Sequence, residues 1–172
     1  MNVKDAIKQR HCIRSFSDKI PSPNIIREMV KYANLAPSAG NLQARDFIIV
    51  DDFEIKKRLG IAALDQDFIA EAPVNIVVCA NLNRISSYGK RGRELYCIQD
   101  SAVAVEHILL VAVDYGLDAC WVGAFDEIAV SEILSLPSHV RPVAIIPIGY
   151  SKGEVVSTTR MDPRSLIHYN EW

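Results

Sequence analysis

A long helical segment from Leu95 to Gly116 constrains the fold of this chain more than any other stretch. Its apolar residues do not keep to one face but surround the helix: Ile98, Val103, Val105, Ile108, Leu109, Leu110, Val111 and Val113. A helix that is apolar all round is buried on every side. A chain of 172 residues offers little protein to cover such a helix, so we expect a second copy of the chain to help bury it. Gly116 is expected to end the helix.

The rest of the chain has the composition of one globular domain, with 49% hydrophobic and 23% charged residues and a formal net charge of -2. This balance gives no sequence-wide basic field that would favour nucleic acid. The four cysteines, Cys12, Cys79, Cys97 and Cys120, form no C-x-x-C pair. That usage is typical of reduced cytoplasmic thiols, and not of a metal site or a disulfide framework. The N-terminus has no apolar signal core, and the most apolar window is too short and too charged to span a membrane.

The spacing of apolar residues predicts helices over residues 3–9, 23–35, 53–63 and 128–134 and strands over residues 47–50, 74–80 and 143–149. The continuous β-rich run of the second strand favours a strand that is covered on both faces. Pro147 in the last strand indicates an edge position or an irregularity. The polar segment from Asn81 to Arg93 is expected to be a surface loop. A lid that turns its basic residues, Lys90 and Arg91 among them, toward a substrate is the alternative.

The segment from Ala36 to Gln43 joins a predicted helix to a predicted strand and combines small residues with two carboxamides. Small side chains, and Gly40 above all, allow the backbone to come close to a ligand. Carboxamides such as Asn41 offer donors and an acceptor that suit a planar ring with mixed edges. Taken alone, the segment is typical of an ordinary helix-to-strand loop.

Two arginines, Arg10 and Arg14, flank His11 and Cys12 near the N-terminus. A guanidinium fits a phosphate well, because its planar fork donates two parallel hydrogen bonds. A solvated basic turn would give the same pattern, and His11 in isolation is more often structural than catalytic. The segment is therefore a candidate anion site that needs support from other parts of the chain.

Two later segments contribute further candidates. The segment from Leu117 to Asp126 is apolar and irregular, and it is either a buried connection or a place where the N–H of Gly123 faces a ligand. The last segment, about 151–172, is polar, carries Arg160 and ends in Trp172. An aromatic C-terminus is more often docked than free, so this segment is expected to form an arm on a partner subunit.

These stretches, in this order and spacing, resemble the FMN-dependent nitroreductase family over nearly the whole chain. The likeness rests on residues 10–14, residues 37–43, residues 116–117 with 121–125, residues 149–150, and Arg160. The resemblance implies an α+β fold in which helices flank a central mixed β-sheet. It also implies a single FMN-binding domain over residues 1–172 and an intertwined homodimer.

The resemblance implies a flavin site that both chains build. It places Arg10, Cys12 and Arg160 at the phosphate and ribityl end of FMN, Arg14 near the pyrimidine edge, and the Gly123 N–H near flavin N5. It brings Pro37, Ser38 and Asn41 from the other subunit. The implied cofactor-binding residues are Arg10, His11, Cys12, Arg14, Pro37, Ser38, Ala39, Asn41, Gln43, Val122, Gly123, Ala124 and Arg160. No catalytic side chain and no metal is required, because the chemistry occurs on the flavin while Gly123 and Arg14 tune it.

The implied activity is transfer of hydride from NAD(P)H, through N5 of FMN, to a small acceptor such as a nitroaromatic or a quinone by a ping-pong route. Two alternatives remain: a flavoenzyme of the same fold that removes halogen or fragments the flavin, and a non-enzymatic flavin-binding protein. The expected partners are a second copy of the chain and the acceptor, with no nucleic acid and no membrane.

Three positions depart from common motifs of the family. Cys12 stands where Ser is common, Ala44-Arg45 stand where Pro and an aromatic residue are common, and Thr158-Thr159 precede Arg160 in place of a second basic residue. The first and third concern the phosphate, and the second concerns packing. Three residues near an expected contact are left without a role: Asp65, Gln66 and Phe68.

Overall fold

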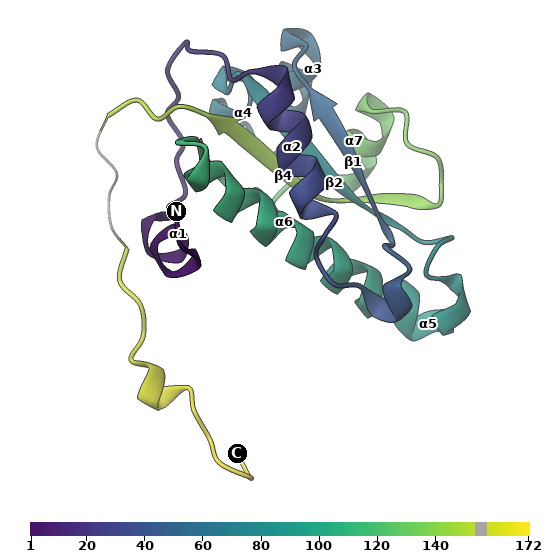
Figure 1. The fold of residues 1–172 in the computed structure, drawn as a ribbon. Helices are drawn as coiled ribbons and strands as arrows, with labels where there is room; N and C mark the ends of the chain where they lie inside the picture. Colours follow the sequence, from purple (N-terminus) through teal and green to yellow (C-terminus); the bar gives the residue numbers. More distant parts are fainter. Residues whose placement is uncertain (154–157) are drawn as a thin grey trace.

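The computed structural model describes residues 1–153 and 158–172, and it has the α+β architecture that the resemblance implied (Figure 1). The sheet has the strand order β1-β2-β4-β3. Its strands are β1 Arg45–Val50, β2 Val74–Asn81, β3 Asp118–Ala119 and β4 Val140–Gly149. All neighbouring strands pair antiparallel. Among the described residues, parallel pairing is confined to an isolated bridge between Cys12 and Ala119, so the sheet itself is antiparallel rather than mixed as the resemblance implied.

Helices cover both faces of the sheet (Figure 1). The main helices are α1 Val3–Gln9, α2 Pro23–Ala33, α3 Phe53–Ala62, α4 Phe68–Glu71, α6 Cys97–Asp114 and α7 Glu127–Ile133. Helix α4 was not predicted, and the predicted ends of the other helices are found within about two residues, because local signals set them. Ser22 accepts the N–H of Asn24 at the start of α2, and Asp126 accepts two N–H groups at the start of α7.

Strand β2 shows why its sequence is apolar without alternation. All of its residues are buried. Ile76 and Val78 pack into a cluster with residues of α2 and α6, whereas Val77 and Cys79 pack into a second cluster with residues of α3 and α7. Successive residues of a strand point to opposite faces, so a sheet covered on both sides needs apolar residues at every position. The prediction of a doubly covered strand is confirmed.

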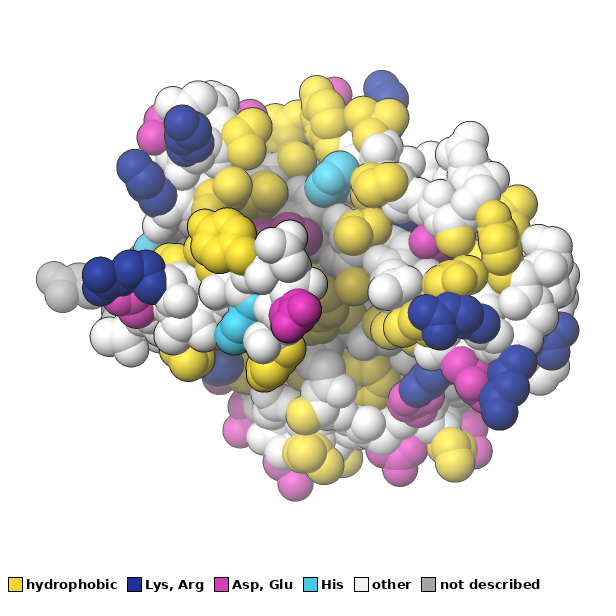
Figure 2. Space-filling model, turned by 90° about the horizontal axis from the view of Figure 1, so that it is seen from below, with side chains coloured by type: hydrophobic (Ala, Val, Ile, Leu, Met, Phe, Trp, Pro, Cys, Tyr) yellow, Lys and Arg dark blue, Asp and Glu magenta, His cyan; other side chains and the backbone are white. Residues whose placement is uncertain are grey.

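Helix α6 is only partly covered by this chain, so burial on every side would need the second copy that the sequence analysis expects. In this chain its buried residues are Cys97, Asp100, Ser101, Ala104, Val105, Ile108, Leu109 and Ala112. On the other side Val103 is 37% exposed, and Leu110 is half-buried. Viewed from below α6, hydrophobic side chains line a hollow in the molecule (Figure 2). Gly116 follows the helix with φ +67 and ends it as predicted.

The segment from Asn81 to Arg93 was expected to be a loop, and this expectation is wrong. The chain is helical from Ser86 through a 3-10 turn, a short α-helical turn α5 (Gly89–Arg91) and a π-helical turn η3 (Gly92–Tyr96) into α6. The reason is tight packing around one buried residue, which the polar composition of the segment does not indicate. Ile85 is fully buried, and Gly92 lies so close that a Cβ there would be 2.8 Å from the Ile85 carbonyl oxygen.

By length and composition alone, the helical run Ser86–Asp114 could cross a membrane. However, 44% of its most apolar window is buried within the chain. The run also packs against α2 and the sheet in one core cluster. The expectation that length and charge rule out a spanning helix is therefore wrong, and the core packing of the run is the observation that favours a core helix.

Strand β4 lies between β2 and β3, so the expectation that Pro147 marks an edge is wrong, while the expected irregularity is present. The carbonyl of Pro147 accepts the N–H of Cys120 at 3.2 Å, but a proline has no N–H to donate in return. Regular pairing with β3 covers only Asp118 and Ala119. The chain leaves the sheet beyond Val122, which bridges Ile145.

The C-terminal segment runs away from the body of the protein (Figure 1), and its described residues, 158–172, are all exposed. Trp172 is fully exposed and stacks on His168 with ring centroids 4.5 Å apart. The segment is thus not docked on its own chain, and its role as an arm on a partner stays a prediction. Part of the expected arm, residues 154–157, lies outside the described residues.

Candidate functional site

The segment that carries the N-terminal arginines lies against β3 and the irregular chain that follows it. The N–H of Ile13 donates to the carbonyl of Ala119 at 3.3 Å, beside the bridge between Cys12 and Ala119. This contact brings Arg10 and Cys12 to the segment from Trp121 to Ala124, although more than a hundred residues separate them. Arg10 Nη1 donates to Cys12 Sγ at 3.7 Å.

The thiol of Cys12 lies in an electropositive setting. Burial opposes its ionisation, but hydrogen bonds from the Trp121 N–H and from Arg10 outweigh it and lower the pKa of Cys12 below its ordinary value of 9.0. Its neighbour Cys120 is the opposite case, because burial raises the pKa of that thiol to about 12. A thiol pKa that is lowered in spite of burial indicates local positive potential. The same potential would favour a bound phosphate.

Arg14 lies over the ring of Phe68, with its guanidinium carbon 5.9 Å from the ring centroid. Two residues earlier, Gln66 donates through Nε2 to the carbonyl of Ala124 at 3.3 Å. Phe68 and Gln66, which were left without a role, therefore contact Arg14 and the predicted flavin-facing segment respectively. The turn that positions them has left-handed residues at Leu64 and Asp65, with φ 62 and 58.

Gly123 presents an unoccupied N–H and open space. Among the described residues no acceptor is paired with its N–H. A Cβ on Gly123 would meet only the Trp121 indole nitrogen, at 3.8 Å, and its φ is not in the left-handed region. Nothing in this chain alone therefore requires a glycine there, which is the pattern expected where a ligand approaches the backbone. We call Arg10, Cys12, Arg14, Gln66, Phe68 and residues 121–124 the arginine group.

The second set of predicted residues forms the loop between α2 and β1. Ser38 Oγ accepts the N–H of Gln43 at 3.0 Å. Gln43 Nε2 donates to the carbonyl oxygen of Asn41 at 3.1 Å and to its Oδ1 at 3.3 Å. Gly40, Asn41 and Gln43 all have positive φ, at 56, 55 and 50. Such left-handed residues outside glycine persist only where surroundings hold them. We call residues 37–43 the loop group.

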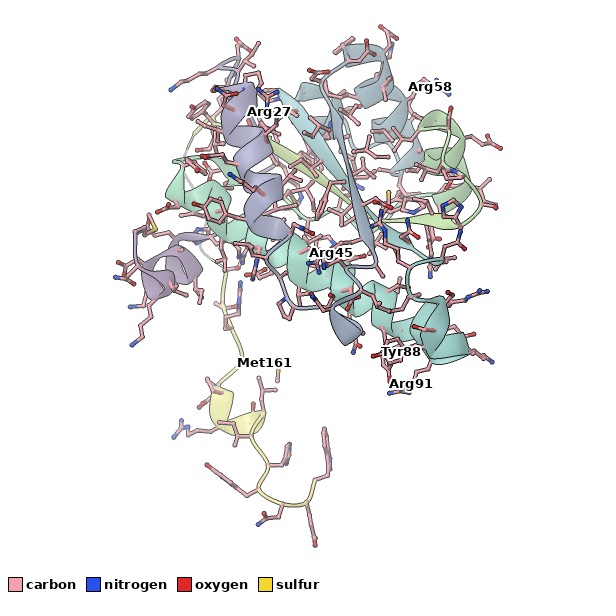
Figure 3. All side chains as sticks on the ribbon, turned by 45° about the vertical axis from the view of Figure 1, so that its right-hand side comes forward. Arg27, Arg45, Arg58, Tyr88, Arg91 and Met161 are labelled. Carbon is pink, nitrogen blue, oxygen red and sulfur yellow. The ribbon has the colours of Figure 1, made fainter. Side chains whose placement is uncertain are left out.

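A buried guanidinium holds the loop group in place. Arg45, which is only 2% exposed, donates to the carbonyls of Asn34, Ala36, Pro37 and Asp100 at 2.6–3.1 Å. The carboxylate of Asp100 accepts the N–H of Ala39 at 2.9 Å. Figure 3 shows Arg45 between the loop and α6. Sequence reasoning missed this network, and the departure at Ala44-Arg45 was its one signal.

Two predicted residues are not brought to either group by the contacts of this chain. Nδ1 of His11 donates to the carbonyl of Gln9 at 2.6 Å, a contact within its own turn. Arg160 Nη1 donates to Thr158 Oγ1 at 2.6 Å and to the carbonyl of Thr159 at 3.1 Å. His11 therefore has a structural contact here, and Arg160 lies on the extended C-terminal segment.

The two groups lie near opposite ends of α6 (Figure 1). The loop group is tied to Asp100 near the start of the helix. The N-terminal amine, which leads into the arginines through α1, pairs with Asp114 at the end of the helix at 2.9 Å. The fourteen residue steps from Asp100 to Asp114 span about 21 Å at 1.5 Å per residue. No hydrogen bond, ion pair or cation–π contact among the described residues joins the arginine group to the loop group.

The chain resembles known proteins over its full length. It is 33% identical to a protein of Archaeoglobus fulgidus provisionally named an NADH dehydrogenase/NAD(P)H nitroreductase, with 96% of each chain covered. It is 26% identical to a protein of Bacillus subtilis named FMN reductase (NADPH), over 99% of this chain and 74% of that one. The structure of NfrA2 from B. megaterium matches with a TM-score of 0.92 at 25% identity, over 100% of this chain and 76% of that one.

A family model described as the nitroreductase family matches residues 7–66 and 61–150. These two matches cover both the arginine group and the loop group. The resemblance drawn from the sequence is confirmed by this match, and so is the prediction of an oxidoreductase. The chain belongs to the nitroreductase family.

Proposed function

We propose that this chain transfers hydride from NAD(P)H through bound FMN to a small acceptor, such as a nitroaromatic or a quinone, by a ping-pong route. Membership of the family supports NAD(P)H-dependent oxidoreduction with FMN as the cofactor. The names of relatives support it too, because they include FMN reductase (NADPH) and NADH dehydrogenase. The acceptor and the ping-pong order are parts of the proposal.

The residues of the arginine group fit FMN. Arg10 and Arg14 supply cations for a phosphate and for an electron-rich ring edge, and the lowered pKa of Cys12 reports positive potential beside them. Gly123 supplies an unpaired N–H beside open space. The guanidinium of Arg14 lies over the ring of Phe68, which helps to hold it in place. A monophosphate with a planar heterocycle matches this donor set, whereas a metal ion finds no group of three His, Cys, Asp or Glu side chains in the described part of the chain.

FMN, when bound, supplies the hydride chemistry at its N5 atom. The protein does not need a nucleophile or an acid–base pair for that chemistry. The N–H of Gly123 would donate a hydrogen bond to the flavin, and the Arg14 cation would stabilise negative charge on the reduced ring by preorganised electrostatics. Arg10, with Arg160 from the arm, would neutralise the phosphate. The loop group would close the site with Pro37, Ser38 and Asn41 and exclude water.

The observation that carries the proposal is the separation of the two groups along α6. A cofactor that touches both must lie between two copies of the chain, where the arginine group of one meets the loop group of the other. The half-covered α6, with Val103 at 37% exposure, and the undocked C-terminal segment supply surfaces for such a homodimer. An intertwined dimer would bury both. The free thiols of all four cysteines support a reducing, cytoplasmic setting.

The test mixes two inactive variants. Arg14→Ala damages the arginine group and Asn41→Ala damages the loop group, and each homodimer then carries two defective sites. A mixed dimer made by refolding them together would carry one site with both defects and one with neither. Part of the NADH oxidation with an artificial acceptor should therefore return. As a control, two loop-group variants, Asn41→Ala and Ser38→Ala, should not rescue each other.

Two results would overturn the proposal. Mixed dimers that form demonstrably and recover no activity would place the cofactor within one chain. Purified protein that retains no FMN and takes none up on reconstitution would remove the cofactor itself. FMN should also raise the melting temperature in a concentration-dependent way, since it binds only the assembled form.

A further inference from the structure

The helical segment before α6 carries an arginine that is held by one tyrosine, Tyr96, and a second tyrosine, Tyr88, packs against that ring. Arg91 Nε donates to the hydroxyl of Tyr96 at 3.0 Å, and its guanidinium carbon lies 5.4 Å from the centroid of the same ring. Tyr88 meets Tyr96 edge to face, with centroids 5.4 Å apart and the planes at 81°. Among the described residues no acceptor is paired with the terminal nitrogens of Arg91. Arg91 is exposed, so these terminal nitrogens are accessible to solvent. The hydrogen bond from Nε to Tyr96 orients the plane of the guanidinium.

This cluster of Tyr88, Arg91 and Tyr96 adjoins the loop group. A Cβ on Gly40 would lie 2.6 Å from the Tyr88 hydroxyl oxygen and 3.3 Å or less from two of its ring atoms. Tyr88 therefore packs directly on the backbone of the loop. Figure 3 shows Tyr88 and Arg91 together at the same end of α6 as Arg45. The cluster thus lies on the rim of the proposed flavin site.

The rim is electropositive. Lys90, Arg91 and Arg93 are exposed, and the one acidic partner on this turn, Glu94, lies 3.7 Å from Lys90. An exposed pair of that length is screened and contributes little. The remaining charge of Arg91 and Arg93 favours an anion at the mouth of the site.

We propose that Arg91, held by Tyr96, binds the 2′-phosphate of NADPH and makes NADPH the preferred hydride donor. This inference rests on the proposed function, because it takes the donor to be a nicotinamide dinucleotide. NADPH differs from NADH only by that phosphate at its adenosine end. A guanidinium binds phosphate through two parallel hydrogen bonds, and an arginine near the ribose is a general means of accepting a 2′-phosphate. The ring of Tyr88, which is 43% exposed, offers a surface on which the adenine ring can lie.

The test compares the two donors on FMN-loaded protein with one artificial acceptor. The ratio of kcat/KM for NADPH to that for NADH should exceed one in the unaltered chain. Arg91→Ala should lower this ratio about tenfold or more, the loss expected for a charge-assisted hydrogen bond. Arg91→Lys keeps the charge without the fork and should give an intermediate ratio. Tyr96→Phe removes only the hydroxyl that holds Arg91 and should also lower the ratio.

The matched control is Arg58→Ala. Arg58 is an exposed arginine on α3 and lies far from Arg91 in Figure 3, so its removal changes the net charge equally without touching the rim. If Arg58→Ala lowers the ratio as much as Arg91→Ala, the effect is diffuse charge and the inference is wrong. It is equally wrong if the unaltered chain shows no preference for NADPH or if Arg91→Ala keeps it.

A binding measurement separates this inference from the proposed function. Adenosine 2′,5′-bisphosphate should bind the FMN-loaded protein more tightly than adenosine 5′-monophosphate in a calorimetric titration, and Arg91→Ala should remove the difference. If neither dinucleotide donates hydride, the proposed function fails, and the titration still decides whether the rim recognises the 2′-phosphate. Equal affinity for the two nucleotides would overturn the inference whatever the activity.

Discussion

Replacing the buried Arg45 by methionine tests whether one guanidinium holds the loop group. The change keeps the apolar stem and removes four hydrogen bonds, to the carbonyls of Asn34, Ala36, Pro37 and Asp100. It also leaves the carboxylate of Asp100, whose Oδ2 already lacks a partner among the described residues, without a nearby cation.

The magnitude follows from opposing contributions. Four hydrogen bonds from a charged donor at about 1.5–3 kcal/mol each give roughly 6–12 kcal/mol. The cost of keeping the cation out of water is several kcal/mol, and burial accordingly lowers the pKa of Arg45 although Asp100 opposes this. We expect Arg45→Met to lower the free energy of unfolding by about 3–5 kcal/mol, the usual loss when a buried charge network is broken. For a chain of this length that lowers Tm by roughly 10 °C.

Urea unfolding at one fixed protein concentration measures the loss, and FMN titration measures its effect on the site. Arg84→Met is the matched control. Arg84 also donates to two backbone carbonyls, that of Gln43 in the loop at 3.2 Å and that of Arg45 at the start of β1 at 2.7 Å. It also pairs with Asp46 at 2.6 Å. Its side chain is 45% exposed, so water replaces its partners and the loss should stay near 1 kcal/mol or less. Equal losses for the two variants would refute the argument from burial.

Three other outcomes are expected. Iodoacetamide should label Cys12 before the three buried cysteines and at a lower pH than a free thiol, and FMN should slow the reaction, because the pKa of Cys12 is lowered beside Arg10; mass spectrometry that finds another cysteine labelled first would contradict this. Gly40→Ala should cost more stability and FMN affinity than Gly116→Ala, since both need positive φ at about 1–2 kcal/mol each but only a Cβ on Gly40 meets Tyr88. The Arg141 side chain lowers the pKa of Glu127 against burial, so this pair stabilises the fold above the ordinary carboxylate pKa of 4.5 and the contribution disappears as pH falls through the folded pKa. Because both side chains are more than 40% exposed, Glu127→Gln should change the acid dependence of urea unfolding by less than about 1 kcal/mol.

Local patterns were sufficient to predict most of the fold. Strand β2, helix α2 and the cap at Asp126 depend on neighbours within a few residues, and each was found where the sequence placed it. The family motifs likewise predict that Arg10–Arg14 and residues 37–43 are parts of a site, and this assignment stays a prediction. The assembly that would join them is a prediction, because it depends on a second copy of the chain.

The features that the sequence did not predict depend on distant contacts. Arg45 meets Asp100 across 55 positions of the chain, and Gln66 reaches Ala124 across 58. Periodicity within a window of ten or so residues carries no information about such pairs. The helical turns before α6 were missed for a related reason: their polar composition is that of a loop, and one buried residue, Ile85, with one close-packed glycine, Gly92, decides the conformation.

The departure at Ala44-Arg45 and the strained loop group have one physical explanation. Three residues of the loop have left-handed φ, two of them not glycine, and each such residue costs of the order of 1–2 kcal/mol. Arg45 donates to the carbonyl of Ala36, just before this loop. The carboxylate of Asp100 accepts the N–H of Ala39 within the loop. A loop held at both its start and its middle does not need a ligand to take its shape. The loop group is therefore formed before the cofactor binds, so FMN affinity should depend on Arg45 through the population of this one conformation rather than through any contact with the flavin.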